Sequence, residues 1–515
     1  MLKNHPKGLL AASLANMGER FGFYIMMAIL LLFLQAKFGI SKEYASTVYS
    51  IFYGSVYVLA LVGGIIADSL KNYKGTILVG LVVMTAGYAL LGVPGGADTT
   101  WLWITYAALA LISLGNGLFK GNLTALIGRM YDNDTYRAQR ESGYSLFYMF
   151  INLGAIFAPL MAVGIRNWWV MHNGFKYDAS LPQLCHQVIN SNGQTIPNNF
   201  VELAQAAGAT GDVQTNAVAF AEQYLGIFNT GFHYAFWAAV AAMLISLTIY
   251  ITNKSKFPAD QKDAPVQQTA TQISKEEIQM SASEIKQRIL ALCAVFGVVI
   301  FFWMSFHQNG VALTLFARDY VDLSAISINL GFTELKGAEI FQSVNPFFVV
   351  TLTPFVLALF AYLKRRNQDP STPMKIVIGM FIAAMAFVVM SVGSLDLPAY
   401  KLIGEDAVKA GTAVAFAKAT PWLLVLTYLI LTLAELFISP LGIAFVSKVA
   451  PPHLQGLMQG LWLCATAVGN SLLFVGTILY DALDIWLVWA CFAGACIFSM
   501  LVMLSMVKWL ERVAK

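Results

Sequence analysis

The sequence predicts an all-α membrane protein with twelve transmembrane helices arranged as two six-helix bundles. Three observations predict it: few charged residues, many long apolar segments and a polar segment near the middle of the chain. Of the 515 residues, 58% are hydrophobic and only 12% are charged, whereas soluble domains carry about 25% charged residues. Much of the surface must therefore face lipid.

A helix needs about 20 apolar residues to cross the hydrocarbon core of a bilayer. The first such segment follows Lys3, His5 and Lys7 like the apolar part of a signal peptide, but it continues to Phe38, so we expect it to be retained as a helix. The predicted spans are 8–36, 44–68, 75–94, 101–128, 140–165, 232–252, 287–316, 341–363, 374–394, 421–447, 455–480 and 484–508.

Basic residues in short connections indicate orientation, since they concentrate on the cytoplasmic side. The even-numbered connections and the C-terminal tail carry most of them, and the connection at 95–100 has none. We therefore expect both termini in the cytoplasm and the chain in the cell (inner) membrane. The basic residues are Lys71, Lys74, Arg129, Arg137, Arg140, Lys254, Lys256, Lys262, Lys364, Arg365, Arg366, Lys448, Lys508, Arg512 and Lys515.

Two long polar connections divide the chain. The predicted units are an N-terminal bundle (1–165, with its sixth span at 232–252), an extracytoplasmic loop or small cap (166–231), a cytoplasmic linker (253–286) and a C-terminal six-helix bundle (287–515). The second part of the linker, Ser274 to Arg288, has helical spacing. The linker lies midway, so it separates six spans from six.

A weak internal sequence repeat, which we call the internal echo, supports two related bundles. Leu118-Phe119 is followed by Phe147 and Gly154, and Leu436-Phe437 is followed by Trp462 and Gly469. In both cases the aromatic residue precedes the glycine by seven positions. Together with the central linker, this pattern predicts two bundles related by pseudo-symmetry with a cavity between them.

Ionisable residues inside the spans are the candidate site, because a charge near the bilayer centre costs at least about 2.5 kcal/mol. They are Glu19, Arg20, Lys120, His307 and Glu435, and they come from both halves of the chain. A site at the interface between the two bundles would require this distribution.

Each of these residues also has a purely structural interpretation. Glu19, Arg20 and Lys120 could form a self-satisfied ion-pair cluster, or a switch in which the carboxylate exchanges partners and protons. Glu435 could bond to a neighbouring hydroxyl, or it could balance a ligand's ammonium group. In the second case, Arg20 and Lys120 opposite Glu435 form a dipolar cavity that suits a zwitterion.

The remaining candidates are a histidine and two tryptophans. His307 could be a neutral core histidine or, because of its titration range, a proton carrier. Trp303 and Trp462 could be packing residues or cavity walls, since ligand pockets are lined by aromatic residues with a few placed polar groups.

Five segments of the chain carry recognisable motifs. They are Asn16-Met-Gly-Glu19-Arg20-Phe21-Gly-Phe23-Tyr24, Gly117-Leu-Phe-Lys120-Gly-Asn-Leu-Thr, Phe147-Tyr-Met-Phe-Ile-Asn152-Leu-Gly154, Phe341-Gln-Ser-Val-Asn345-Pro346 with Thr353-Pro354-Phe355, and Glu435-Leu-Phe-Ile-Ser439-Pro440. These segments resemble motifs of the proton-dependent oligopeptide transporter family, within the major facilitator superfamily; the first resembles its ExxERFxYY motif and the third its FYxxINxG motif. The resemblance covers about 480 residues of the chain.

The resemblance implies the major facilitator fold, proton-coupled uptake of di- and tripeptides, and a role for each matching residue. Lys120 and Arg20 would receive the peptide carboxylate, and Glu19 would exchange ion pairs with them. Glu435 would hold the amino terminus. Asn152 and Asn345 would bond to the peptide backbone, and the side-chain pockets would be lined by Tyr24, Tyr57, Trp303, Trp462 and Thr466.

The chain departs from the family pattern at titratable positions. Asn16 stands where the family motif has its first glutamate, Phe23 replaces the first tyrosine of the pair, and Met27 replaces a frequent basic residue. His307 stands where span 7 commonly has an acid. We hypothesise that His307 takes over part of that acid's role in proton coupling.

Other functions remain as alternatives. The chain could carry another small zwitterionic or anionic solute on the same fold, or it could be a sensor that binds peptide without transporting it. No catalytic triad, metal-ligand cluster or nucleotide loop is visible, and the five cysteines show no paired spacing. We therefore expect no enzymatic activity, no cofactor and no metal. The net charge of +4 does not suggest nucleic-acid binding, and we expect a monomer in the lipid bilayer.

Overall fold

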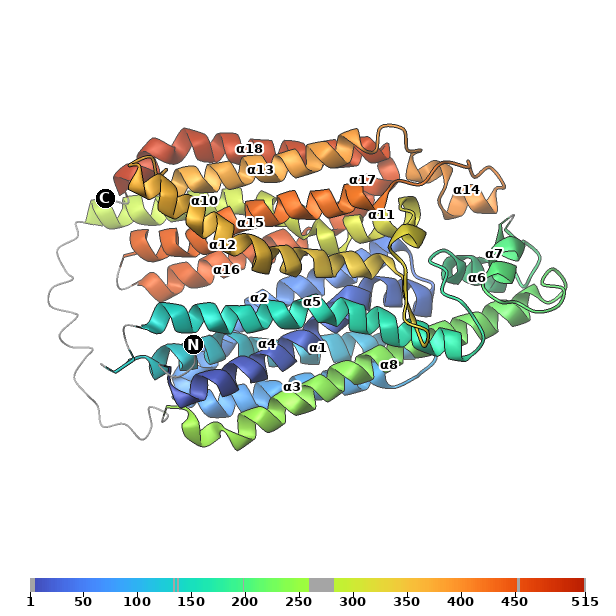
Figure 1. The fold of residues 1–515 in the computed structure, drawn as a ribbon, viewed down its shortest axis with the longest axis horizontal. Helices are drawn as coiled ribbons and strands as arrows, with labels where there is room; N and C mark the ends of the chain where they lie inside the picture. Colours follow the sequence, from blue (N-terminus) through green and yellow to red (C-terminus); the bar gives the residue numbers. More distant parts are fainter. Residues whose placement is uncertain are drawn as a thin grey trace.

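The computed structural model describes residues 5–132, 135–136, 139–197, 199–258, 282–451 and 454–513. Within these ranges, twelve helical spans are long and apolar enough to cross a membrane. This number confirms the prediction. The long helices run roughly parallel to one another (Figure 1), and they form two halves.

The N half contains six long helices. The first helix packs between the fifth and the sixth, while the fourth packs against the second and third. These helices are α1 (Lys7–Phe38), α2 (Lys42–Leu70), α3 (Tyr73–Gly92), α4 (Thr99–Met130), α5 (Arg140–His172) and α8 (Ala217–Thr252).

The C half contains the other six spans, and two of them are broken into shorter helices. The unbroken helices are α12 (Val344–Arg365), α13 (Thr372–Val392), α15 (Pro421–Val449) and α18 (Ile485–Val513). One broken span consists of α10 (Ala282–Phe306), η4 (His307–Gly310) and α11 (Ala312–Tyr320), and the other consists of α16 (Gln455–Ser471) and α17 (Phe474–Ala482).

Short elements gather at one end of the molecule, which we call the cap end. It carries α6 (Leu181–Asn190) and α7 (Phe200–Ala206), with α14 (Glu405–Lys409) beside them (Figure 1). The hairpin of β1 (Ile328–Asn329) and β2 (Glu334–Leu335) packs on α5. The other short elements of the C half are η5 (Leu323–Ile326), η6 (Ala338–Ser343) and η7 (Tyr400–Leu402). Element η3 (Lys254–Lys256) directly follows α8.

The helix that contains the predicted sixth span, 232–252, extends further toward the N-terminus than that span. Helix α8 begins at Ala217, and α5 continues to His172, so the connection predicted over 166–231 is shorter. The early turns of α8 carry an aromatic row in which the Tyr224 ring stacks on Phe220 and Phe228 at 5.9 and 5.8 Å. These turns pack on α6 rather than on lipid alone. A hydropathy criterion for membrane-spanning residues therefore missed them.

The predictions for spans 7 and 11 missed the breaks inside them. Hydropathy continues through both segments, but the backbone turns into a 3₁₀ helix at His307, and α16 ends at Ser471. Broken helices within a membrane are tolerated where protein or a water-filled cavity satisfies the freed backbone groups. Most of the predicted linker at 253–286 lies outside the described residues.

The internal echo marks equivalent helix crossings. A Cβ atom on Gly154 of α5 would lie 2.9 Å from the carbonyl oxygen of Met17 on α1. A Cβ atom on Gly469 of α16 would lie 2.8 Å from the carbonyl oxygen of Ile300 on α10. Each glycine lets two backbones approach closely, so the fifth and eleventh spans cross the first and seventh in the same way.

Polar contacts join the two halves at the cap end. Arg166 on α5 forms a buried ion pair with Glu339 on η6, and Lys42 on α2 pairs with Asp481 on α17. Among the described residues, these are the ion pairs that cross between the halves. The Asn167 side chain also donates to two backbone carbonyls of the hairpin segment, at 2.7 and 2.8 Å. The structure is thus fastened at its cap end.

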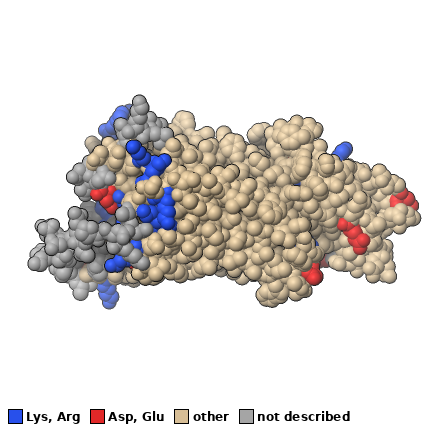
Figure 2. All heavy atoms as spheres, turned by 90° about the horizontal axis from the view of Figure 1, so that it is seen from below, with Lys and Arg blue, Asp and Glu red and all other residues tan. Residues whose placement is uncertain are grey.

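The two ends of the molecule differ in charge. Lys and Arg side chains gather at the end opposite the cap, as the face in Figure 2 shows, and exposed acidic residues lie toward the cap end. The exposed basic residues of the described chain include Lys71, Lys256, Lys364, Arg365, Arg366, Lys508 and Arg512. Helix α1 begins, and α18 ends, at this basic end (Figure 1).

Candidate functional site

The first charged pair of the site lies inside the N half. Glu19 and Arg20 are neighbours on α1, and the guanidinium group donates two hydrogen bonds of 2.5 Å to the carboxylate. Glu19 is completely buried and Arg20 is 4% exposed. Asn116 on α4 adds a third donor, from its amide nitrogen to Glu19 Oε1 at 3.0 Å. In this arrangement the charge of Arg20 is neutralised within its own half.

Lys120 has a different environment one turn further along α4. Its Nζ atom lies 4.4 Å from the centre of the Tyr57 ring on α2, at the distance of a cation–π contact. No acidic side chain of the described residues forms an ion pair with it. An anionic group entering the site would therefore meet an ammonium group that has no ion-pair partner among the described residues, although Glu19 lies within electrostatic reach of it.

Glu435 is the corresponding anion in the C half. It lies on α15, and its Oε2 atom accepts a hydrogen bond of 3.0 Å from the side-chain amide of Asn345 on α12. The same amide donates to the hydroxyl of Thr432 at 2.9 Å. Among the described residues, no basic side chain pairs with Glu435. The predicted bond to a neighbouring hydroxyl is replaced by a bond to Asn345.

Two tyrosines link the charged groups of the two halves. Tyr24 and Tyr57 both lie within electrostatic reach of Arg20 in the N half and of Glu435 in the C half. Lys120 likewise lies within reach of His307 on the opposite half. The structure therefore brings the predicted cations and the predicted carboxylate to one interface.

His307 stands where span 7 breaks. Its ring stacks on Trp303 with centres 5.0 Å apart and an angle of 15°, and it meets the Tyr53 ring of the N half edge-on at 5.1 Å. The side chain of Asn470 lies beside it, yet within the described chain neither His307 Nδ1 nor that amide has a hydrogen-bond partner. The ring is thus held mainly by stacking, and its Nδ1 makes no hydrogen bond of good geometry to a described residue.

The other predicted residues are placed less decisively. Trp303 and Trp462 are buried at 6% and 3% exposure, and Trp462 packs edge-on against Phe296. The Thr466 hydroxyl donates to the Trp462 carbonyl, and the Asn152 amide donates to the Tyr148 carbonyl, each within its own helix. The side-chain donors of Thr466 and Asn152 are therefore occupied within their own helices.

Sequence reasoning missed three polar partners of the site: Asn116, Thr432 and Asn470. Asn116 precedes Lys120 by four positions, so both lie on one face of α4. That spacing could have identified Asn116. Nothing in the sequence signals that Asn470 lies beside His307, because the two residues are on different broken spans.

Comparison with known proteins identifies relatives along most of the chain. The POT family model matches residues 74–274 and 259–484. The peptide transporter YePEPT of Yersinia enterocolitica is 28% identical over 506 residues, covering 93% of this chain and 89% of that protein. The uncharacterized transporter YclF of Bacillus subtilis is 27% identical, covering 91% of this chain and 87% of its own length.

Solved structures show the same fold. The crystal structure of peptide transporter POT in complex with sulfate matches with a TM-score of 0.72 and 21% identity, covering 100% of this chain and 96% of the other. A POT family transporter in complex with 5-aminolevulinic acid matches with a TM-score of 0.70 and 19% identity, covering 100% and 98%. The family match spans most of the chain, and the chain is a member of the POT family.

Proposed function

We propose that this protein is a secondary transporter that carries di- and tripeptides together with protons by alternating access. One observation carries the proposal: Lys120 and Glu435 stand on opposite halves without ion-pair partners among the described residues. A peptide has a carboxylate at one end and an ammonium group at the other. It would supply both missing charges, and so bind across the interface between the halves.

The names of the relatives support this substrate class. Besides YePEPT, the dipeptide and tripeptide permease B of Xenorhabdus bovienii is 25% identical to this chain, covering 92% of the chain and 86% of the permease. A second candidate is another small zwitterion, because Asn16 and His307 stand at positions where the family commonly has acids. Competition of dipeptide uptake by single amino acids and by 5-aminolevulinic acid separates the two candidates.

The Glu19–Arg20 pair provides a way to couple protons to peptide. In the proposed cycle, a proton that reaches Glu19 weakens the two bonds to Arg20, and the guanidinium group turns to the peptide carboxylate beside Lys120. Loss of the proton restores the pair and releases the peptide. Because the exchange stays within the N half, it can proceed before the halves move.

We also propose that the basic end of the molecule is cytoplasmic and that the chain lies in the inner membrane. The support is the positive-inside rule, applied to the exposed basic residues that gather away from the cap in Figure 2. On this assignment the contacts at the cap end close the site toward the outside.

We predict that the binding of each peptide terminus depends on one residue of the protein. Glu435→Gln should weaken Ala-Ala binding about ten- to a hundredfold and leave N-acetyl-Ala-Ala unaffected, because the blocked peptide has no ammonium group. Lys120→Gln should weaken Ala-Ala similarly and leave the C-terminal amide of Ala-Ala unaffected. Binding by calorimetry measures both effects.

Exposed residues of the cap end provide matched controls for these variants. Glu202→Gln and Lys176→Gln make the same chemical changes on exposed side chains, and they should bind all three peptides like the parent. If the blocked peptides lose as much affinity as Ala-Ala in the site variants, the pairing of peptide termini with these residues is wrong.

For proton coupling, we predict that His307→Gln lowers peptide-driven proton uptake into liposomes while peptide exchange across the membrane continues. The reason is that His307 stands beside Lys120 at the interface with an unpaired ring nitrogen. His172→Gln, an exposed histidine at the end of α5, is the control. Unchanged coupling in His307→Gln would remove this residue from the proton pathway.

Orientation predicts the labelling of introduced cysteines. A membrane-impermeant maleimide should label Thr215→Cys, at an exposed position of the cap segment, in intact cells. It should label Gln368→Cys, at an exposed position of the basic end, only after the membrane is permeabilised. The reverse pattern would place the cap in the cytoplasm.

A further inference from the structure

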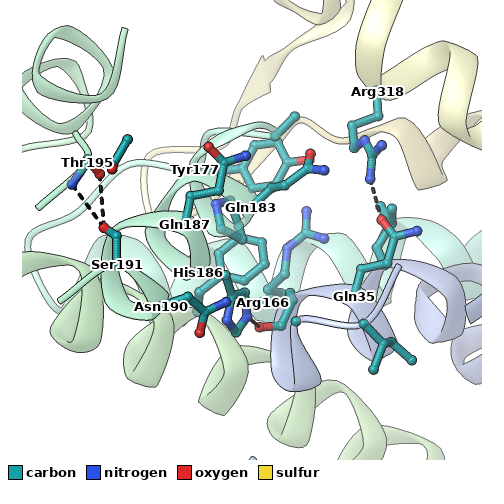
Figure 3. A pocket seen from close by; sticks show the side chains of 17 residues that line it. Gln35, Arg166, Tyr177, Gln183, His186, Gln187, Asn190, Ser191, Thr195 and Arg318 are labelled. Atoms are coloured by element: carbon teal, nitrogen blue, oxygen red, sulfur yellow. Dashed lines mark hydrogen bonds between the residues drawn. The ribbon is translucent and has the colours of Figure 1, made fainter. Parts of the chain in front are cut away.

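A cavity of about 480 Å³ lies at the cap end, away from the central site. It is lined by residues of α1, α5 and α8 of the N half, of α6 of the cap, and of α11 of the C half. Figure 3 shows it from close by, with Arg318 and Gln35 on one side and the side chains of α6 on the other. None of its lining residues belongs to the central set.

The cavity is lined by two arginines and by no acidic residue of the described chain. Arg166 is fully buried. Its Nε donates to Asn167 at 3.0 Å, its Nη1 pairs with Glu339, and its Nη2 has no partner among the described residues. The stacked ring of Tyr177, 4.4 Å from the guanidinium carbon, restricts its movement. An unsatisfied charged donor is thus held on a side chain that lines the cavity, and the second carboxylate oxygen of its ion-pair partner Glu339 likewise has no hydrogen-bond partner among the described residues.

The second arginine belongs to the other half. Arg318 on α11 donates to both oxygens of Asp319 and, through Nη1, to the side-chain oxygen of Gln35 on α1 at 2.5 Å. The nitrogen of the same Gln35 amide has no partner within the described residues. Its donor is therefore unsatisfied, on a side chain that lines the cavity, while its acceptor bridges the halves.

The cap supplies an amide that is unpaired on both sides. Gln187 on α6 is 8% exposed, lines the cavity, and has neither its oxygen nor its nitrogen hydrogen-bonded to any described residue. Buried polar groups nearly always have a partner. A group that offers one donor and one acceptor is complementary to another amide.

We propose that this cavity binds a small solute with a carboxylate at one end and an amide at the other. The carboxylate accepts from Arg166 Nη2 and Gln35 Nε2, and charge-assisted bonds of this kind are the strong ones. The amide pairs with Gln187. The site is separate from the one proposed for transported peptide, because it needs neither Lys120 nor Glu435 and no carboxylate of the described residues lines it to balance an ammonium group.

Occupancy would favour the state that is closed at the cap end. Arg166 and Gln35 belong to the N half, and Gln35 is held by Arg318 of the C half. If the halves separate at this end, the carboxylate loses its prearranged donors. A ligand that binds one state more tightly shifts the equilibrium toward it. This consequence, but not the binding itself, rests on the proposed transport function.

The test uses N-acetyl-L-alanine, which has a carboxylate and an amide but no ammonium group, on the purified full chain. Calorimetry should give a dissociation constant of about 1 mM. N-acetyl-L-alanine amide, which lacks the carboxylate, should bind at least tenfold more weakly. Absence of binding to the parent protein, as expected if water alone fills the cavity, or equal binding of the two compounds would overturn the proposal.

Variants then locate the site. Gln187→Leu should weaken binding at least tenfold, and Gln187→Glu, which keeps the shape, should do the same by repelling the carboxylate. Gln205→Leu, on an exposed position of α7, should bind like the parent, and Lys120→Gln should not weaken binding, because this ligand has no need of the central cation. Loss in Lys120→Gln but not in the Gln187 variants would place the compound in the central site and refute the assignment.

Transport provides the second readout. N-acetyl-L-alanine outside liposomes should lower the maximal rate of dipeptide uptake in the parent and not in Gln187→Leu. Failure of the transport proposal would appear differently: dipeptide uptake would be absent from the start, while the calorimetric binding would persist.

Discussion

The structure depends on one electrostatic constraint: an ionised side chain inside a membrane protein must find a partner or water. The chain meets this constraint in three ways. Glu19 and Arg20 neutralise each other within the N half. Arg166 and Glu339 neutralise each other across the two halves. Lys120 and Glu435 have no ion-pair partner among the described residues, and Tyr57, which contacts Lys120, also lies within electrostatic reach of Glu435.

In the proposed alternating-access cycle, these three arrangements have different roles. The pairs across the halves fasten the cap end, and breaking a buried pair exposes each charge to an unfavourable environment unless water enters. The pair within the N half can open and close without moving the halves. The unpaired charges gain most when a zwitterion enters, because such a ligand brings both counter-charges at once. Binding energy is thereby available to bias the movement of the halves.

The sequence predicts the parts of this design that depend on composition along the chain. Lipid-facing length is a local property, so hydropathy identified all twelve spans. Close helix crossings need small residues, and the spacing that ends at Gly154 and Gly469 marks one such crossing in each half. Charges that are rare within spans stood out as well, and the structure brings Lys120 and Glu435 to one interface.

The rest depends on contacts between residues that are distant in sequence. Arg166 was placed in a loop because a charge at the edge of an apolar run resembles a boundary, and its partner Glu339 lies on a different half. The start of α8 at Ala217 depends on packing against the cap rather than on lipid. The break at His307 is also invisible to hydropathy, since apolar residues continue on both sides. None of these features follows from one segment considered alone.

The central claim is that one zwitterionic peptide spans the gap between the two halves. The most direct measurement is an experimental structure of the protein with Ala-Ala bound. We expect the peptide carboxylate within hydrogen-bonding distance of Lys120 Nζ and the ammonium group beside the Glu435 carboxylate. A peptide bound to one half only, or with its termini away from both groups, would contradict the account.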